Sequence, residues 1–264
     1  MSMYPKAINE AREKYLERVD GGEGAKVTVD GRLVALTDPH GAAAESYRIL
    51  LYRLRQARVQ AQPGGSVIAV TSAVRGEGVS LTAANLALTA ARNGETRVAL
   101  LDCDLRKGAL SGLFGLGARS GLSELLQGRA ELGEAMGKFH EGHLAVIPAG
   151  KPTAEPAGLL AGPRFLALIG QLRMLFDEVY LDVPPALATA DAGIVAHRSD
   201  GVVLVAKAEV TPREQIAAAV RALAGTPLLG VVLNGVDPGR VPSPMQAIKG
   251  RLGNRKLLSA GEPQ

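Results

Sequence analysis

Val70-Thr71-Ser72-Ala73-Val74-Arg75-Gly76-Glu77-Gly78-Val79-Ser80 connects an apolar run to a helix-forming segment through a turn that holds two glycines. Glycine permits a tight backbone turn, in which successive N–H groups converge on an anion at the start of a helix. The stretch is similar to the phosphate-binding pattern G-x-x-x-x-G-K-[ST], whose lysine reaches the terminal phosphates and whose hydroxyl binds magnesium. We therefore predict a strand, a phosphate-type turn and a helix, in this order.

The match to this pattern is incomplete. Ser80 keeps the hydroxyl position, but Val79 stands in the lysine position and Ala73 in that of the first glycine. Glycine-rich turns between a strand and a helix are common, so a plain turn is the alternative interpretation until the rest of the chain is considered.

The composition bounds the class of protein. A chain of 264 residues, 47% hydrophobic but only 3% aromatic and without Trp, is long enough for one α/β domain with an aliphatic core. One cysteine, Cys103, excludes an intramolecular disulfide and fits a reducing compartment. No signal peptide and no apolar run near the roughly 18 residues of a spanning helix are seen, so we expect a cytoplasmic protein. The net charge of +4 does not by itself indicate nucleic-acid binding.

Three domains or segments are predicted. Residues 1–36 form an N-terminal extension, with an amphipathic helix over 3–19 and a hairpin around Asp30-Gly31. Residues 37–240 form the main domain. Residues 241–264 form a basic tail, for which a solvated segment is favoured over a membrane-surface helix because glycines interrupt it.

Short apolar runs predict the strands of the main domain, and the segments between them have helical patterns. The strands are expected at 66–71, 97–104, 144–148, 179–182, 201–207 and 228–234. Helices are expected after Asp38-Pro39, at 81–93, as short pieces over 110–138, at 159–176 and after Thr211-Pro212, with Thr211 as the cap. This alternation predicts an α/β fold with a mostly parallel sheet and helices on both faces.

Carboxylates end two of the predicted strands. Asp102 and Asp104 end one of them and Asp182 ends another. Ligands of open α/β sheets bind at the carboxyl ends of the strands, and magnesium prefers oxygen ligands. The three residues are therefore candidate magnesium-site residues. No Ser-His-acid spacing supports a hydrolase, and no aromatic platform supports single-stranded nucleic acid.

Taken together, these stretches resemble the bacterial tyrosine kinases (BY-kinases) of capsule and exopolysaccharide systems, which are P-loop proteins related to the MinD/ParA ATPases. The resemblance runs from about Leu33 to Asp237. Its motifs are Glu45-Ser46-Tyr47-Arg48, Thr71-Ser72 with Gly76-Glu77-Gly78-x-Ser80, Leu101-Asp102-Cys103-Asp104-Leu105-Arg106, residues 121–128, Phe176 to Pro185 and Leu229 to Val236.

The resemblance implies roles by position. Gly76, Glu77, Gly78, Val79 and Ser80 would surround the phosphates of ATP or ADP, and Asn234 would face the adenine. Ser80, Asp102 and Asp182 would serve Mg²⁺, and in an active kinase Asp102 and Asp104 would serve the attacking hydroxyl.

The departures from the family pattern predict a pseudokinase. Val79 replaces the lysine and Leu81 the following threonine, and the C-terminal tyrosine cluster is absent, since the last tyrosine is Tyr180. Binding of ATP or ADP with Mg²⁺ is therefore expected to be weak or absent. Leu51 replaces the final arginine of the oligomerisation motif E-x-x-R-x-x-R, so we expect a monomer or small oligomer.

The expected role is that of a regulator or scaffold recruited to the inner membrane. The family implies a membrane-spanning polysaccharide co-polymerase or activator in trans as partner, with an active kinase of the same family as a second candidate. One alternative is a divergent but active kinase or ATPase that binds ATP with its remaining carboxylates and a substitute arginine, Arg75 or Arg106, although neither occupies the place of the lysine. The other is a MinD/ParA-like positioning protein.

Overall fold

The computed structural model describes residues 29–57, 64–139 and 143–237; the predictions for residues 1–28 and 238–264 lie outside this part. The elements in chain order are α2 (Val34–Thr37), α3 (Ala42–Ala57), β1 (Ser66–Ser72), α4 (Val79–Ala91), β2 (Val98–Asp102), α5 (Leu110–Leu113), α6 (Leu122–Gln127), α7 (Leu132–Ala135), β3 (Gly137–Phe139), β4 (Leu144–Ile147), α8 (Pro156–Ala161), α9 (Pro163–Leu175), β5 (Glu178–Asp182), α10 (Asp191–Ala196), β6 (Gly201–Lys207), α11 (Arg213–Ala222) and β7 (Leu228–Asn234).

One sheet carries all these strands, in the order β3-β4-β2-β5-β1-β6-β7. All neighbouring pairs are parallel except β3 with β4, which is antiparallel. Every residue of β1, β2 and β5 is buried, as aliphatic strands covered on both faces require. The α/β fold with a mostly parallel sheet is confirmed.

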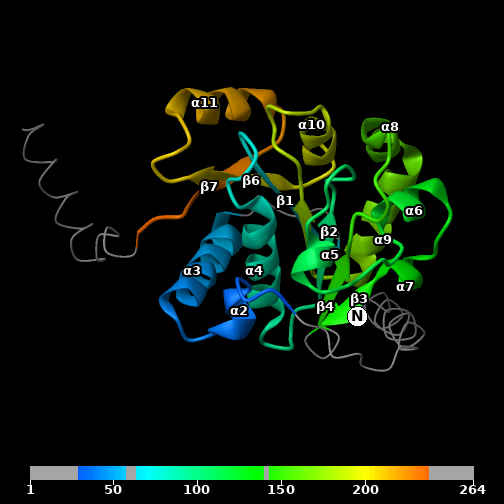
Figure 1. The fold of residues 1–264 in the computed structure, drawn as a ribbon, viewed down its shortest axis with the longest axis horizontal. Helices are drawn as coiled ribbons and strands as arrows, with labels where there is room; N and C mark the ends of the chain where they lie inside the picture. The colour runs from blue at the N-terminus through cyan, green and yellow to red at the C-terminus, as the bar shows by residue number, and fades with distance from the viewer. Residues whose placement is uncertain (1–28, 58–63, 140–142, 238–264) are drawn as a thin grey trace, which may run out of the picture.

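Helices cover the sheet on both faces (Figure 1). On one face, α2, α3, α4 and α5 contribute to a core cluster with Ile68, Leu100 and Tyr180. On the other face, α6 to α11 pack on a second cluster that includes Leu101, Phe165 and Leu204. The alternation of side chains along the buried strands divides them between the two cores. In the described part of the chain, no helix has the length and apolar character needed to cross a bilayer.

The predicted N-terminal boundary needs correction. Val34–Thr37 is a helix and not a strand of a hairpin, because Asp30 turns the chain by accepting hydrogen bonds from the backbone and guanidinium of Arg32. Leu33 and Ala35 are buried in the core beside α4, and the Asn85 side chain accepts a hydrogen bond from the Ala35 N–H at 3.0 Å. The folded domain thus begins before residue 37.

Two smaller predictions were also wrong, and one strand was missed. The helix expected over 159–176 is two helices, because Gly162 is extended and Pro163 starts α9. The three-residue strand β3 was not predicted. Thr211 does not cap α11: Pro212 stands at the cap position, and the Thr211 hydroxyl binds a glutamate of the glycine-rich turn instead.

Candidate phosphate-binding site

The turn between β1 and α4 depends on two glycines in left-handed conformations. Gly76 has φ +84° and Gly78 has φ +90°, and Gly78 directly precedes the first residue of α4. A Cβ on Gly78 would lie 2.1 Å from the Asn234 amide nitrogen, so no side chain fits there without movement. These residues form the predicted strand, turn and helix at the carboxyl edge of the sheet.

Glu77 ties this turn to two other loops. Its buried carboxylate accepts hydrogen bonds from the Val74 N–H, at 2.9 Å, and from the Thr211 hydroxyl. Its carbonyl accepts a hydrogen bond from the Asn234 side chain, also at 2.9 Å. The turn is therefore held from inside by its own glutamate, and from outside by the residues that precede α11 and end β7.

Ser80 and Asp182 lie together below the turn. Burial raises the pKa of Asp182 well above its usual range, the neighbouring charge of Asp102 adds to this, and a hydrogen bond from the Ser80 side chain opposes it. Asp102 and Asp182 are register partners on adjacent strands. In a P-loop site, a hydroxyl and a carboxylate at this edge bind the magnesium ion together with a phosphate oxygen.

The Asp102 carboxylate accepts hydrogen bonds from three backbone N–H groups. Burial raises its pKa to about 6, although the N–H groups of Leu110, Asp104 and Ala109 stabilise the charged form. Oδ2 accepts from Ala109 at 2.7 Å and from Leu110 at 3.0 Å, and Oδ1 accepts from Asp104 at 3.1 Å. Asp102 therefore also fixes the beginning of α5.

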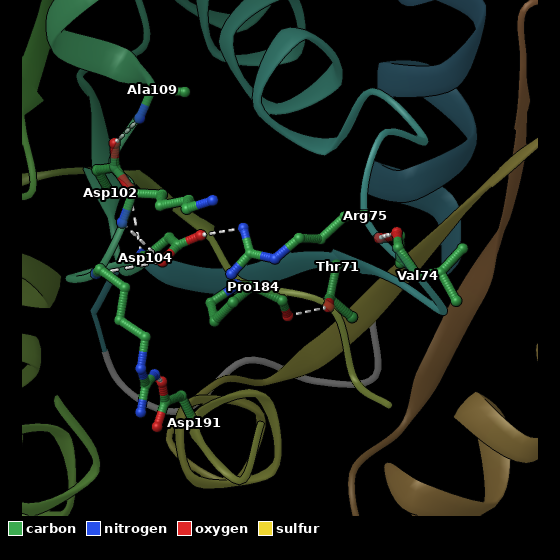
Figure 2. A network of polar contacts seen from close by, with 11 residues as sticks. Thr71, Val74, Arg75, Asp102, Asp104, Ala109, Pro184 and Asp191 are labelled. Carbon is green, nitrogen blue, oxygen red and sulfur yellow. Dashed lines mark hydrogen bonds and ion pairs between the residues drawn. The ribbon is translucent and has the colours of Figure 1, made fainter. Parts of the chain in front are cut away.

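Asp104 contacts the glycine-rich turn through the side chain of Arg75 (Figure 2). Oδ1 accepts the backbone N–H groups of Arg106 and Lys107, at 3.2 and 3.1 Å, while Oδ2 lies 3.3 Å from Nη1 of Arg75. Arg106 does not contact this carboxylate with its side chain but pairs with Asp191 at the beginning of α10. Among the residues that the structure describes, no group of three or more His, Cys, Asp or Glu side chains is arranged to hold a metal ion by itself.

Val79 occupies the lysine position but cannot bind a phosphate as the lysine does. It is half-buried and packs against the core cluster formed with α3 and α4. An isopropyl group offers no charge and no hydrogen-bond donor, so the contact that an ammonium would make with a terminal phosphate is missing from this position.

The structure brings the predicted site residues together at one edge of the sheet. The turn and the start of α4 are formed by Gly76, Glu77, Gly78, Val79 and Ser80. Asp102 and Asp182 are the last residues of β2 and β5, and Asp104 lies two residues beyond the end of β2. Asn234, at the end of β7, contacts the turn through Glu77. The ion pairs of Arg75 and Arg106 and the Thr211–Glu77 hydrogen bond were not predicted, because each joins residues far apart in the sequence.

The sheet is mostly parallel, and one edge of it carries a glycine turn, a hydroxyl at the start of a helix and carboxylates at strand ends. This arrangement is that of the P-loop NTPase fold class. No family model matches the chain. It is 37% identical over 205 residues, 77% of this chain and 85% of the relative, to tyrosine-protein kinase YwqD of Bacillus subtilis. It is 34% identical over 174 residues, 65% of this chain and 75% of the relative, to tyrosine-protein kinase CpsD of Streptococcus agalactiae. The chain belongs to the bacterial tyrosine-protein kinase family.

Solved structures agree with this assignment. The kinase domain of the Escherichia coli tyrosine kinase ETK matches with a TM-score of 0.74 and 28% identity, covering 87% of this chain and 89% of that domain. The cell division ATPase MinD of Pyrococcus furiosus matches with a TM-score of 0.55 and 27% identity, covering 70% and 79%. Against the longer kinase wzc of Salmonella typhimurium, the chain spans 31% of the relative's length.

Proposed function

We propose that this protein is a member of the bacterial tyrosine kinase family in which phosphoryl transfer is impaired, and that it acts as a regulator or scaffold in polysaccharide synthesis or export. The observation that carries the proposal is the apolar packing of Val79 in the position of the phosphate-binding lysine.

The expected size of the defect follows from how phosphoryl transfer works. Catalysis depends almost wholly on positioning and on neutralising the charge of the phosphates. One charge-assisted hydrogen bond contributes about 1.5–3 kcal/mol, so its loss weakens nucleotide binding by about 10- to 100-fold. The loss in the transition state is larger, because charge moves onto the oxygens that the lysine would contact.

The remaining residues fit a magnesium–nucleotide complex in part. Ser80 and Asp182 would hold the metal, with Asp102 behind them, and the turn from Gly76 to Ser80 would enclose the phosphates. The bound nucleotide would supply the phosphoryl group in an active relative. Asn234 would lie beside the base while its amide holds Glu77 in place.

A membrane-spanning partner in trans completes the proposal. Support comes from the resemblance to kinases of capsule and exopolysaccharide systems and from the family membership. We expect the purified protein to bind the cytoplasmic segment of the co-polymerase of its own polysaccharide system, with an active kinase of the same family as a second partner. Recruitment to the inner membrane would then depend on that partner.

Phosphate release and phosphotyrosine formation test the impaired activity. The wild-type chain, incubated with Mg-ATP alone and with the partner segment, is expected to show neither above the level of Asp182→Asn. Val79→Lys is expected to strengthen Mg-ADP binding. Turnover by the wild-type chain at rates typical of its relatives contradicts the proposal. It would favour a divergent active kinase, in which Asp102→Asn abolishes phosphotyrosine on the partner.

A further inference from the structure

We infer that Arg75 supplies the positive charge that the phosphate turn lacks, and that a nucleoside di- or triphosphate bound here is held by its guanidinium. The inference rests on the proposed function in one respect, because it requires that the turn still binds a ligand although the lysine is missing. It adds a residue that determines which anions the turn accepts.

The position of Arg75 is the first reason. It belongs to the turn itself, one residue before Gly76, and its side chain extends across the edge of the sheet toward the end of β2 (Figure 2). It is 46% exposed and meets Asp104 through a single contact of 3.3 Å. Charge-assisted hydrogen bonds are ordinarily about 2.7–2.9 Å long, so this pair is loose. An exposed, loose ion pair is readily exchanged for a phosphate.

The second reason is that Asp104 does not depend on Arg75. Its other oxygen keeps the backbone N–H groups of Arg106 and Lys107 when the guanidinium leaves. The carboxylate is also 15% exposed, so water can take the place of the arginine. Moving Arg75 from Asp104 to a phosphate therefore leaves no buried charge without a donor.

Arg106 does not have this freedom. It pairs with Asp191, whose side chain is fully buried, and the other oxygen of Asp191 has no hydrogen-bond partner in the described part of the chain. Withdrawing Arg106 would leave a buried carboxylate uncompensated, which is strongly destabilising. Of the two arginines that pair with carboxylates at this edge, Arg75 is the one that is available to a ligand.

The chemistry of the group gives a third reason and sets the ligand class. A guanidinium presents paired N–H donors in a planar fork, which match two oxygens of one phosphate. The Arg75 side chain leaves the turn at a different residue from the lysine of the pattern. It therefore supplies a positive charge, but not at the place where the lysine ammonium would lie. The expected result is binding of polyphosphates with little support for transfer.

Isothermal titration of the full chain with Mg-ADP, and separately with inorganic tripolyphosphate, tests the inference. Arg75→Ala is expected to weaken binding of both probes by about 10-fold or more, with Arg75→Lys between it and the wild type. Lys107→Ala and Lys207→Ala remove other cations near the same edge, and Arg221→Ala removes an exposed one near the end of α11. Each of these controls is expected to change the dissociation constants by less than about 3-fold.

A charge-replacement variant separates loss of charge from loss of shape. Val79→Lys is expected to restore Mg-ADP binding to Arg75→Ala, because the ammonium then occupies its usual place. Failure to restore binding would mean that the turn had lost its shape, and would overturn the inference. Should Arg75→Ala fail to fold, Arg75→Gln keeps the side-chain volume and replaces it in the same comparison.

Two further outcomes overturn the inference. One is a wild-type chain that binds neither probe at millimolar concentration, and this leaves the proposed regulatory function standing. The other is an Arg75→Ala variant that binds Mg-ADP as tightly as the wild type. A wild-type chain that turns over ATP at its relatives' rates, with binding lost in Arg75→Ala, contradicts the proposed function and supports this inference.

Discussion

The guanidinium of Arg173 on α9 faces the carboxylate of Asp200 in a two-pronged ion pair, in which Nη1–Oδ2 and Nη2–Oδ1 are both 2.7 Å. The same guanidinium donates to the Gly65 carbonyl at 2.9 Å, and the same carboxylate accepts the Val67 N–H at 2.7 Å. This pair therefore joins α9 to the beginnings of β1 and β6, at the opposite ends of the strands from the phosphate turn.

Arg173→Met is expected to lower the free energy of unfolding by about 3–5 kcal/mol, because the Asp200 charge, only 17% exposed, then loses its partner. Urea unfolding measures this as a lower midpoint at an unchanged slope. The double variant Arg173→Met/Asp200→Asn is expected to recover part of the loss, since no charge is left unpaired. The exposed Arg221→Ala serves as control, and equal losses in Arg173→Met and Arg221→Ala would contradict the role given to this pair.

Tyr180 is expected to stay unphosphorylated while the protein is folded. Its side chain is fully buried on β5, and its hydroxyl donates to Glu178 at 2.6 Å. Tyr52 on α3 is 66% exposed and is the accessible comparison. Mass spectrometry after incubation with Mg-ATP and an active bacterial tyrosine kinase should find phosphate on Tyr52 in preference to Tyr180. Phosphate on Tyr180 in protein that remains folded would refute this.

Glu77→Ala is expected to loosen the phosphate turn. The substitution leaves the Val74 N–H and the Thr211 hydroxyl without their acceptor, at a cost of about 1–3 kcal/mol. Hydrogen exchange of the Val74 amide should become faster, while exchange in β2 stays slow. Glu77→Gln keeps one acceptor oxygen, so its Val74 amide should exchange at a rate between those of the wild type and Glu77→Ala. Unchanged exchange at Val74 in Glu77→Ala would show that the carboxylate does not hold the turn.

Local sequence patterns were sufficient for most of the sheet. Strands β1, β2, β5 and β6 are short β-branched and aliphatic runs. Such runs are typical of strands that are covered on both faces of a sheet. The glycines of the phosphate turn were equally predictable, because few residues other than glycine adopt these backbone angles. Strand β3 escaped prediction because three residues carry too little pattern.

The parts of the site that were missed depend on tertiary structure. Thr211 followed by Pro212 has the sequence signature of a helix start, but Glu77 competes for the threonine hydroxyl across 134 positions of the chain. Likewise, nothing next to Arg75 or Arg106 in the sequence distinguishes the arginine that lies loosely on Asp104 from the one that pairs with buried Asp191. That distinction comes from burial, which single-sequence patterns do not report.

Gly78 and Asn234 provide a test of how closely β7 supports the turn. Gly78→Ala puts a Cβ 2.1 Å from the Asn234 amide nitrogen and forces an L-residue into a left-handed conformation, so both terms lower stability. Gly76→Ala is the matched control, because φ is also positive there but nothing lies within 4 Å of the added Cβ. Gly76→Ala should cost about 1–2 kcal/mol, and Gly78→Ala more. Asn234→Ala should cost less in the Gly78→Ala background than in the wild type, because it removes the steric conflict there, whereas the hydrogen bond to the Glu77 carbonyl is lost in both backgrounds. Strictly additive losses in this cycle, measured by urea unfolding, would show that Asn234 does not press on the turn.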